Sequence, residues 1–260
     1  MTDTADTIAR QGRRSSVRWA AFLAAADVLA WLCALAYAIE GAPVAVVAVF
    51  AYAALSLLAV CVLYVRSFDG ANPGPVLKGT RHAWLQPLFV PYRVVAWTIT
   101  ALARVLHVRD PVISEIGPGV FMGVRLFPHE HAMLSERGVR SVLDLTSELP
   151  TNRVLSRAPF ERYGLPTLDR TPPTIDEIAR AADWAAARVA AGDGVYIHCA
   201  FGRGRSATLA AAVCLRLGWA HDATGAVALV ARKRPVIRVG GAQLAALHSY
   251  ASRLASTPAP

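Results

Sequence analysis

Two long apolar runs near the N-terminus constrain the fold of this chain more than any other feature. Residues 19–39 are apolar except for Asp27, and residues 44–65 contain no charged side chain. Each run has the length of about 20 residues that a helix needs to cross roughly 30 Å of hydrocarbon. Hydrophobic residues make up 55% of the chain, which is a high share for a soluble domain. The pattern predicts a transmembrane helical hairpin over residues 19–66, with a buried helical pair in a soluble domain as the alternative.

The positive charges predict how this hairpin is oriented. Basic residues flank it on both sides, with four arginines inside the polar tail of residues 1–18 and with Arg66, Lys78 and Arg81 after the second run. The turn between the runs has neither Lys nor Arg, so the positive-inside rule places both ends in the cytoplasm, in a multi-pass protein of the cell membrane. A cleavable signal peptide is the alternative, because residues 34–36 resemble a cleavage site. Asp27 is expected to pack between the helices, with a functional intramembrane acid as the alternative.

The next two segments predict a linker and an amphipathic helix. Residues 67–82 are rich in Gly and Pro, which is typical of a linker. In residues 83–109, two faces separate at about 100° per residue. One face carries Arg93, Thr100, Arg104 and His107, and the other carries Val95, Ile99, Leu102 and Leu106. We expect this helix to lie on the membrane surface; a third span, which would put the rest of the chain outside the cell, is the alternative.

Residues 110–256 alternate between strand and helix patterns, which is typical of an α/β domain. The predicted strands cover residues 119–123, 140–145 and 194–198, and the predicted helices cover residues 131–137, 174–191 and 206–217. Thr174 and Glu177 form a capping box at the start of the second of these helices. The buried face of that helix is expected to carry Ile178, Ala181, Ala182 and Ala185.

The loop between the last predicted strand and the helix after it carries the chemistry. Residues 198–206 are His-Cys-Ala-Phe-Gly-Arg-Gly-Arg-Ser. The backbone N–H groups of a Gly-rich turn and the N-terminus of the next helix form a cradle for an anion of phosphate size. Arg205 can donate two parallel hydrogen bonds to such a phosphate. The same positive surroundings are expected to lower the pKa of the Cys199 thiol, so that its thiolate attacks phosphorus.

The other residues of this loop are expected to bind the substrate or to hold the loop. Ser206 can hydrogen-bond the sulfur when the sulfur becomes the leaving group, and His198 is expected to hold the loop through its ring nitrogens. The expected substrate-binding positions are His198, Ala200, Phe201, Gly202, Arg203 and Gly204.

A carboxylic acid is also required, because the leaving oxygen needs a proton. Asp169 lies in a segment that we expect to be a loop, residues 165–173, and is the preferred general acid. Asp176 competes with it, but lies in the first turn of a predicted helix, where it complements the helix dipole. Asp144, inside a predicted strand, is expected to be structural.

Residues 115–250 resemble the dual-specificity branch of the cysteine-dependent protein tyrosine phosphatases. The resemblance rests on Val-Tyr-Ile-His-Cys from residue 195 and Arg-Ser-Ala-Thr from residue 205. It implies a central mixed sheet flanked by helices, a phosphocysteine intermediate, and neither a metal nor another cofactor. It also implies that Cys199 is the nucleophile, that Arg205 binds phosphate, that Ser206 assists departure of the thiolate and that Asp169 is the general acid.

Within this family the chain is similar to the mitochondrial phosphatase of phosphatidylglycerophosphate, as a membrane-anchored member of bacterial type. Both carry Gly-Arg-x-Arg-Ser after the cysteine and a Pro-Thr stretch near the acid. Several phospholipid-directed members have a base where this chain has Arg203, so the resemblance implies a lipid phosphate; the alternative for Arg203 is an ion pair with a nearby acid. The basic segment 232–238 either faces the lipid surface or is a solvated loop.

Charge and cysteine content narrow the partners further. The 27 Lys and Arg against 18 Asp and Glu give a net charge of +9, which favours anionic partners such as phosphate groups and acidic lipids. Nucleic acid is not expected, because no motif for it is present. The four cysteines form neither a disulfide framework nor a paired metal-ligand spacing.

We therefore expect a membrane-anchored phosphomonoester hydrolase. Its expected substrate is a lipid phosphate such as phosphatidylglycerophosphate or a phosphoinositide. The alternative is a dual-specificity phosphatase that acts on tyrosine, serine or threonine phosphates of membrane-associated proteins, and a phosphate-binding scaffold without turnover is a third hypothesis.

Overall fold

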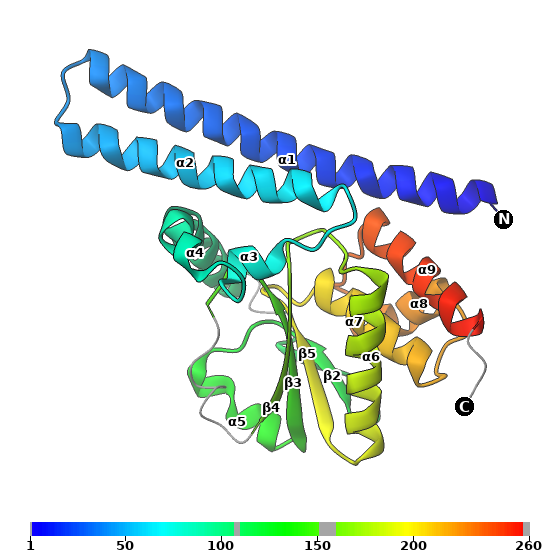
Figure 1. Ribbon diagram of the computed structural model, residues 1–260. Coiled ribbons are helices and arrows are strands. Elements are labelled where there is room, and N and C mark those ends of the chain that lie inside the picture. Colours follow the sequence, from blue (N-terminus) through cyan, green and yellow to red (C-terminus); the bar gives the residue numbers. More distant parts are fainter. Residues whose placement is uncertain (1, 107–109, 151–159, 257–260) are drawn as a thin grey trace.

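The computed structural model describes residues 2–106, 110–150 and 160–256, with the backbone alone for residues 2–16, 18 and 19. A five-stranded sheet forms its centre (Figure 1). The strand order is β1 (Ile113–Gly117), β2 (Val120–Gly123), β5 (Gly194–His198), β3 (Val139–Thr146) and β4 (Glu161–Thr167). β1 pairs antiparallel with β2, and every other pair is parallel. The predicted central mixed sheet is confirmed.

Three of these strands lie where the sequence predicts them, and the two outer ones do not. β2, β3 and β5 overlap the predicted strands, whereas β1 and β4 were not predicted. β4 contains Gly164 and Pro166, which argue against a strand in the sequence. Pro is tolerated here because β4 is an edge strand. The loop predicted over residues 165–173 begins only after Thr167, so the predicted start of the loop was wrong.

Helices cover both faces of the sheet (Figure 1). α6 (Ile175–Ala190) and α7 (Arg205–Arg216) pack on one face, and α8 (Ala223–Lys233) and α9 (Gly241–Ser256) pack against α7. The main hydrophobic core lies between these helices and the sheet. A smaller core on the opposite face includes Leu134 of α5 (Ala132–Ser135), which follows the short helix η2 (Pro128–Glu130).

The start of α6 agrees with the sequence in detail. The N–H of Glu177 donates to the hydroxyl of Thr174 at 3.2 Å, and the Glu177 carboxylate accepts from the N–H of Thr174 at 2.9 Å. This is the predicted capping box. The four predicted inner-face residues of α6 are all buried.

Two long antiparallel helices, α1 (Thr2–Ile39) and α2 (Val44–Ser67), precede this domain and lie across its upper edge (Figure 1). The tail predicted for residues 1–18 continues as helix, because α1 already begins at Thr2. Within the described residues, three helical stretches are long and apolar enough to cross a membrane: Ala20–Ile39, Val44–Ser67 and Ala83–Leu106. Asp27 is buried and interacts electrostatically with Cys61 of α2, which agrees with a packing role.

The predicted linker is packed against the domain rather than loose. It contains the short helix α3 (Gly74–Lys78), which contacts β4. A Cβ atom on Gly74 would lie 2.0 Å from the carbonyl oxygen of Pro166, so only glycine permits this approach. The side-chain amide of Asn72 also donates to the carboxylate of Glu177 at 3.2 Å. The linker thereby joins the hairpin to both β4 and α6.

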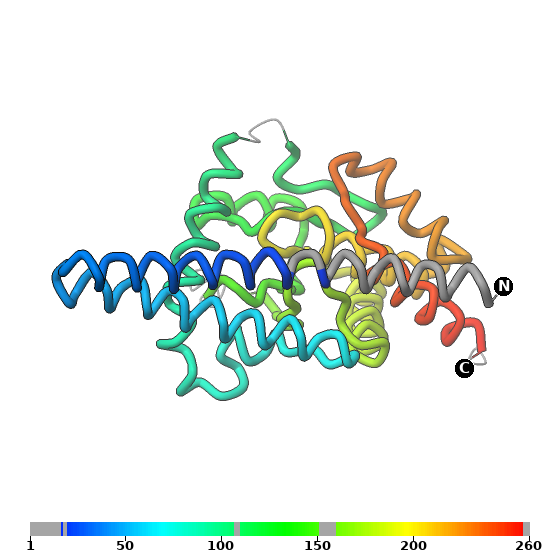
Figure 2. Tube along the Cα trace, turned by 90° about the horizontal axis from the view of Figure 1, so that it is seen from above, coloured from blue at the N-terminus to red at the C-terminus, as the bar shows by residue number. Residues whose placement is uncertain are grey.

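The amphipathic segment forms a short helix, η1 (Ala83–Phe89), followed by α4 (Val90–Leu106). Seen from above, α4 runs crosswise to the hairpin (Figure 2). The two predicted faces are present: Val95, Ile99, Leu102 and Leu106 are exposed, whereas Thr100 is buried. The polar face lies against protein, because Arg93 donates to the carbonyl of Leu77 and Arg104 pairs with Glu130. His107 lies outside the described residues.

Candidate functional site

The Cys199 loop lies where the sequence predicts it, between the end of β5 and the start of α7. Gly202 has a φ of +64°, which an L side chain rarely adopts. A Cβ atom there would also lie 2.5 Å from the backbone carbon of Gly123 in β2. The loop therefore turns tightly against the neighbouring strand, and glycine at this position is required by both conformation and space.

Cys199 is buried, and two groups that can donate hydrogen bonds lie beside its sulfur. The N–H of Gly202 donates to Cys199 Sγ at 3.3 Å, and the hydroxyl of Ser206 lies 3.4 Å from the same sulfur. The structure thus brings together Cys199 and Ser206, as the sequence predicts.

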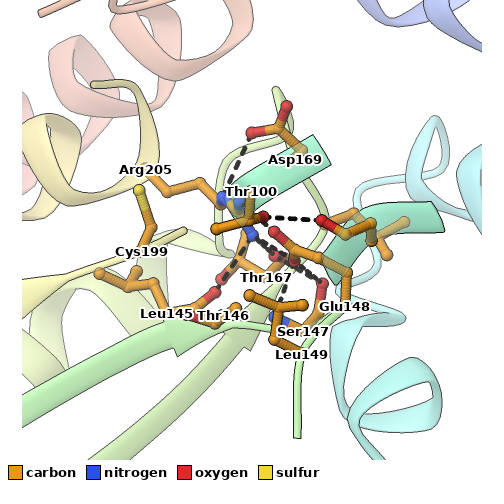
Figure 3. Close-up of polar contacts among 12 residues, drawn as sticks. Thr100, Leu145, Thr146, Ser147, Glu148, Leu149, Thr167, Asp169, Cys199 and Arg205 are labelled. Carbon is orange, nitrogen blue, oxygen red and sulfur yellow. Dashed lines mark hydrogen bonds and ion pairs between the residues drawn. The ribbon is translucent and has the colours of Figure 1, made fainter. Parts of the chain in front are cut away.

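Arg205 is fully buried and forms a bidentate ion pair with Glu148, which follows β3 (Figure 3). Its two terminal nitrogens lie 2.8 and 2.7 Å from the two carboxylate oxygens of Glu148. One of them also donates to the carbonyl of Thr167 at 2.9 Å. The guanidinium is therefore fixed by β3 on one side and by the end of β4 on the other.

This pairing perturbs the pKa of both partners. Burial alone would raise the pKa of Glu148, but the charge of Arg205 and the hydrogen bonds from it outweigh burial and lower that pKa. Burial alone would lower the pKa of Arg205, but the nearby carboxylates, Glu148 above all, raise it. The pair is held in its charged form.

The sequence analysis missed Glu148. A usable signal was present, because Glu148 follows the buried strand β3, which pairs in parallel with β5. The carboxyl ends of parallel strands meet at the same edge of a sheet, and ligand sites lie there. A carboxylate two residues beyond the end of β3 is therefore expected to lie beside the Cys199 loop.

Of the two acids that competed in the sequence, Asp169 is the one beside Arg205. Its carboxylate oxygen lies 3.3 Å from Arg205 Nε, and its side chain is about one-third exposed (Figure 3). Asp176 lies in the first turn of α6 and pairs with Arg253 on the surface. Of these two acids, only Asp169 pairs with the guanidinium of Arg205.

His198 lies beneath the loop, where its ring stacks on Tyr196 with centroids 5.6 Å apart. Within the described residues its ring nitrogens form no well-aligned hydrogen bond, but the ring interacts with the backbone of Cys199 at the start of the loop. That His198 holds the loop through its ring nitrogens stays a prediction. Its Nε2 lies 3.8 Å from an oxygen of Asp144. Burial lowers the pKa of His198 to about 4, against the opposing attraction of Asp144.

Asp144 is structural, as expected, but its partner comes from the linker. Lys78 of α3 donates to Asp144 at 3.0 Å and to the carbonyls of Thr146 and Leu149 at 2.8 and 3.0 Å. Burial alone would raise the pKa of Asp144, but the charges of His198 and Lys78 and the N–H of Thr146 lower it. Helix α3 therefore ends in a buried cation near the end of β3, at the edge of the sheet that carries the Cys199 loop, here called the catalytic edge.

Two arginines of the site have partners within the protein. Arg203 pairs with Asp110 at 2.5 Å, which is the alternative that the sequence left open for it. Arg234, in the basic segment 232–238, is fully buried, and its Nε donates to the carbonyl of Gly202 at 2.8 Å. Both interpretations of that segment were therefore wrong for Arg234, which supports the loop from behind.

The other loop positions contribute mainly backbone. The carbonyl of Ala200 accepts from the N–H of Arg125 at 3.2 Å, and the carbonyl of Gly204 accepts from the N–H of Thr208 at 2.9 Å. The carbonyl of Arg203 accepts from the N–H of Arg238 at 2.8 Å. Phe201 is half-buried. These contacts fix the backbone of the loop.

The segment that carries Asp169 is attached to the hairpin. One buried hydrophobic cluster, here called the anchor cluster, consists of Ala20, Leu23, Val60, Tyr64, Leu77, Phe89 and Leu168. Leu168 is its only member from the α/β domain, and it directly precedes Asp169. The remaining members come from α1, α2, α3 and η1. The catalytic edge of the sheet therefore lies directly beneath the hairpin (Figure 1).

The chain matches the family model described as "Polymorphic toxin system, DSP-PTPase phosphatase" over residues 116–219. The human protein named phosphatidylglycerophosphatase and protein-tyrosine phosphatase 1 is 29% identical over 145 aligned residues, covering 52% of this chain and 71% of that protein. The mouse protein of the same name is 28% identical over 180 aligned residues, covering 60% of this chain and 92% of that protein.

Solved structures share the fold of the α/β domain. Tk-PTP in its active form is 26% identical, with a TM-score of 0.51, and the match covers 55% of this chain and 98% of that one. PTPMT1 in complex with PI(5)P is 23% identical, with a TM-score of 0.52, covering 56% and 98% of the two chains. The second likeness concerns the fold alone. The α1–α2 hairpin lies before the region matched by the family model.

Proposed function

We propose that this chain, a cysteine-dependent phosphatase of the dual-specificity type, hydrolyses phosphomonoesters on membrane lipids. The observation that carries the proposal is the position of the catalytic edge beneath the hairpin. Leu168, the neighbour of Asp169, packs in the anchor cluster among side chains of helices that are apolar enough to cross a membrane. A site held there lies beside the headgroups of the lipids that surround the anchor.

The proposed reaction begins with attack of the Cys199 thiolate on phosphorus. A sulfur–phosphorus bond forms as the ester bond breaks, and Asp169 gives a proton to the leaving oxygen. Water then attacks the phosphocysteine, Asp169 takes a proton from that water, and inorganic phosphate leaves as the thiolate is restored. Ser206, 3.4 Å from the sulfur, donates a hydrogen bond to the departing thiolate.

The loop and Arg205 supply the electrostatic part of the proposed mechanism. The N–H groups of the loop and the N-terminus of α7 stabilise the equatorial oxygens of the transferring phosphoryl group. Arg205 adds a planar donor, and its bidentate pair with Glu148 fixes the plane of the guanidinium. A donor that is already oriented needs no reorganisation when charge develops on these oxygens.

The names of relatives support both substrate classes. The human and mouse relatives are named for phosphatidylglycerophosphate and for protein tyrosine phosphate, and a related structure contains PI(5)P. The alternative function is therefore dephosphorylation of tyrosine, serine or threonine in membrane-associated proteins. We favour a lipid substrate because of the α1–α2 hairpin, which packs onto the loop that carries Asp169. Neither the names of the relatives nor the shared phosphatase fold accounts for this hairpin.

A substrate panel tests the proposal. The full chain in mixed detergent micelles is given phosphatidylglycerophosphate and phosphoinositides on one side, and phosphotyrosine and phosphoserine peptides on the other. We expect a higher kcat/KM on the lipid phosphates. Equal or reversed preference would remove the lipid proposal and leave the protein phosphatase.

The Cys199→Ser variant tests the catalytic scheme separately. We expect it to bind phosphate and to release none from p-nitrophenyl phosphate, because a serine hydroxyl is not ionised in this loop at neutral pH. Full activity of this variant would contradict the scheme for either substrate class.

A further inference from the structure

Two tyrosines of the anchor lie next to the catalytic residues. Tyr64 is in the last turn of α2 and Tyr92 is in the first turn of α4. Tyr64 is a buried member of the anchor cluster, and Tyr92 packs against that cluster together with Leu168. Helices α2 and α4 thus each place one phenol near the loop that carries Asp169.

Both hydroxyls interact with the charges of the site. The phenols of Tyr64 and Tyr92 interact electrostatically with each other and with Asp169, Glu148 and Arg205. The side chain of Tyr64 is 1% exposed, and within the described residues the hydrogen-bond partner near its hydroxyl is the phenol of Tyr92. A hydrogen bond between two phenols uses one of their two O–H groups, so the pair retains an O–H that can donate to a further acceptor.

The position of Tyr64 along α2 fits a lipid headgroup. Tyr64 lies three residues before Ser67, where α2 ends, and Arg66 lies between them. Tyrosine and arginine at the end of a membrane-spanning helix lie at the level of the headgroups. The phosphate of a phospholipid monoester lies at that same level, with its acyl chains among the apolar side chains of the helices.

We propose that Tyr64 and Tyr92 form part of the substrate pocket and donate hydrogen bonds to the headgroup of the lipid phosphomonoester. The inference rests on the proposed lipid function and adds the residues that select for it. The two hydroxyls make the anchor part of the substrate site, so that a lipid phosphate gains contacts that a small soluble phosphate ester does not. They lie on the headgroup side of the site and act on binding rather than on bond breaking.

Removing each hydroxyl alone tests the proposal. The variants Tyr64→Phe, Tyr92→Phe and the double variant keep the rings and their packing. Tyr52→Phe is a matched control, because Tyr52 is also in α2 and its hydroxyl donates to the carbonyl of Pro87 in η1. Each full-length variant is assayed in mixed micelles with phosphatidylglycerophosphate and, in the same preparation, with p-nitrophenyl phosphate.

The measured quantity is the ratio of kcat/KM on the lipid to kcat/KM on the aryl ester. This ratio does not depend on how much of a preparation is folded. Loss of a hydrogen bond to a charged group costs about a factor of ten, so we expect each single variant to lower the ratio about tenfold and the double variant to lower it about a hundredfold. The change should lie in KM for the lipid, because groups remote from the reacting atoms bind ground and transition states equally. Tyr52→Phe should keep the wild-type ratio.

The outcomes separate this inference from the proposed function. If the wild type prefers lipid and the double variant keeps its ratio, the tyrosines only pack the anchor and this inference is wrong while the function stands. A fall in the ratio for Tyr52→Phe as large as that for Tyr64→Phe would also overturn it, since any anchor tyrosine would then suffice. If the wild type prefers phosphopeptides, the lipid function fails and this inference fails with it.

Discussion

Arg205 connects the groups that the proposed reaction needs. Its terminal nitrogens bind Glu148, and its Nε lies beside Asp169. A buried charge that loses its partner is strongly destabilising, so Glu148 has to remain with Arg205 whatever else binds there. Asp169 is different, because its side chain is about one-third exposed and it has a single contact with the guanidinium. It can exchange Arg205 for the leaving oxygen of a substrate without leaving a charge uncompensated.

The first prediction concerns this acid. Asp169→Asn cannot give a proton to the leaving oxygen, so we expect kcat to fall by about 10²–10⁴ on an alkyl phosphate. The fall should be much smaller on p-nitrophenyl phosphate, whose leaving group needs no proton. Steady-state rates over a series of esters with increasing leaving-group pKa measure this, and the slope of log kcat against that pKa should steepen.

Asp176→Asn is the matched control for this prediction. Asp176 lies seven positions further along the chain and pairs with Arg253 on the surface, so its loss should leave the series unchanged. If Asp176→Asn steepened the series and Asp169→Asn did not, the general acid has been assigned to the wrong carboxylate.

The second prediction concerns pH. The pKa of His198 falls from its ordinary value of 6.5 to about 4 in the folded protein, mainly because of burial. Between these two values the unfolded chain binds more protons than the folded one, so the free energy of unfolding decreases as pH falls from about 6.5 to about 4. The full shift corresponds to about 3 kcal/mol. Asp144 and Glu148, whose pKa values are lowered, act in the same direction at lower pH.

Thermal unfolding of the full chain in detergent between pH 7 and pH 4.5 checks this. His198→Phe keeps the stacking on Tyr196 and removes the titrating ring, so its stability should depend less on pH than that of the wild type. The difference between the two proteins isolates His198 from His131, whose pKa burial also lowers. Parallel pH curves for wild type and variant would contradict the prediction.

At the scale of elements, α3 connects the anchor to the sheet through one buried ion pair. Lys78 and Asp144 have side chains only 4% and 8% exposed. We expect Lys78→Met to destabilise the protein by about 3–5 kcal/mol, because it leaves the Asp144 carboxylate buried without its partner. Chemical unfolding of the full chain in detergent measures the loss.

Two further variants separate charge from packing in this prediction. Adding Asp144→Asn to Lys78→Met removes the unpaired charge, so the double variant should be more stable than Lys78→Met alone. Arg188→Met breaks the exposed pair with Glu161, whose side chains are 34% and 49% exposed, and should cost less than about 1 kcal/mol. A double variant less stable than the single one would show that Lys78 acts by packing and not by charge.

The elements that could be predicted are those whose signals lie close together in the sequence. The capping box depends on two residues three positions apart, and the loop around Cys199 depends on one strand, one turn and one helix start. The faces of α4 follow from helical periodicity. Hydrophobic length predicted the hairpin. In each case the physical cause lies within a few turns of chain, so the sequence alone contains it.

The contacts that could not be predicted join residues far apart in the chain. Lys78 and Asp144 are 66 positions apart, and Arg234 and Gly202 are 32 apart. From the sequence alone, a basic segment such as residues 232–238 is expected to be solvated, because the carbonyl that Arg234 binds belongs to a distant residue. Likewise, the polar face of α4 was expected to face water or headgroups, and only the fold shows Glu130 beneath Arg104. Tertiary pairing decided these cases, and local pattern contains no trace of it.

At the scale of the whole molecule, both ends of α4 are tied to the same α/β domain, one through α3 and the other directly. Near its start, Arg93 binds the carbonyl of Leu77 in α3, and α3 is fixed to β3 through Lys78. Near its end, Arg104 pairs with Glu130 of η2. A helix of 17 residues rises about 25 Å, close to the thickness of the hydrocarbon layer. If α4 crossed the membrane, one folded domain would have to contact both membrane surfaces.

We therefore propose that α4 lies along the membrane surface with its apolar face in lipid, and this leads to the last prediction. With two spans, the N-terminus and the C-terminus are on the same side of the membrane, and the excess of positive charge around the hairpin makes that side the cytoplasm. Reporters that are active on only one side, fused at the N-terminus, after Gly41 in the turn between α1 and α2, and at the C-terminus, should place the two ends in the cytoplasm and the turn outside. A third span through α4 predicts that the C-terminal reporter moves to the outside while the N-terminal one stays. That result would put the phosphatase domain, and with it the lipid leaflet that it can reach, on the opposite face of the membrane.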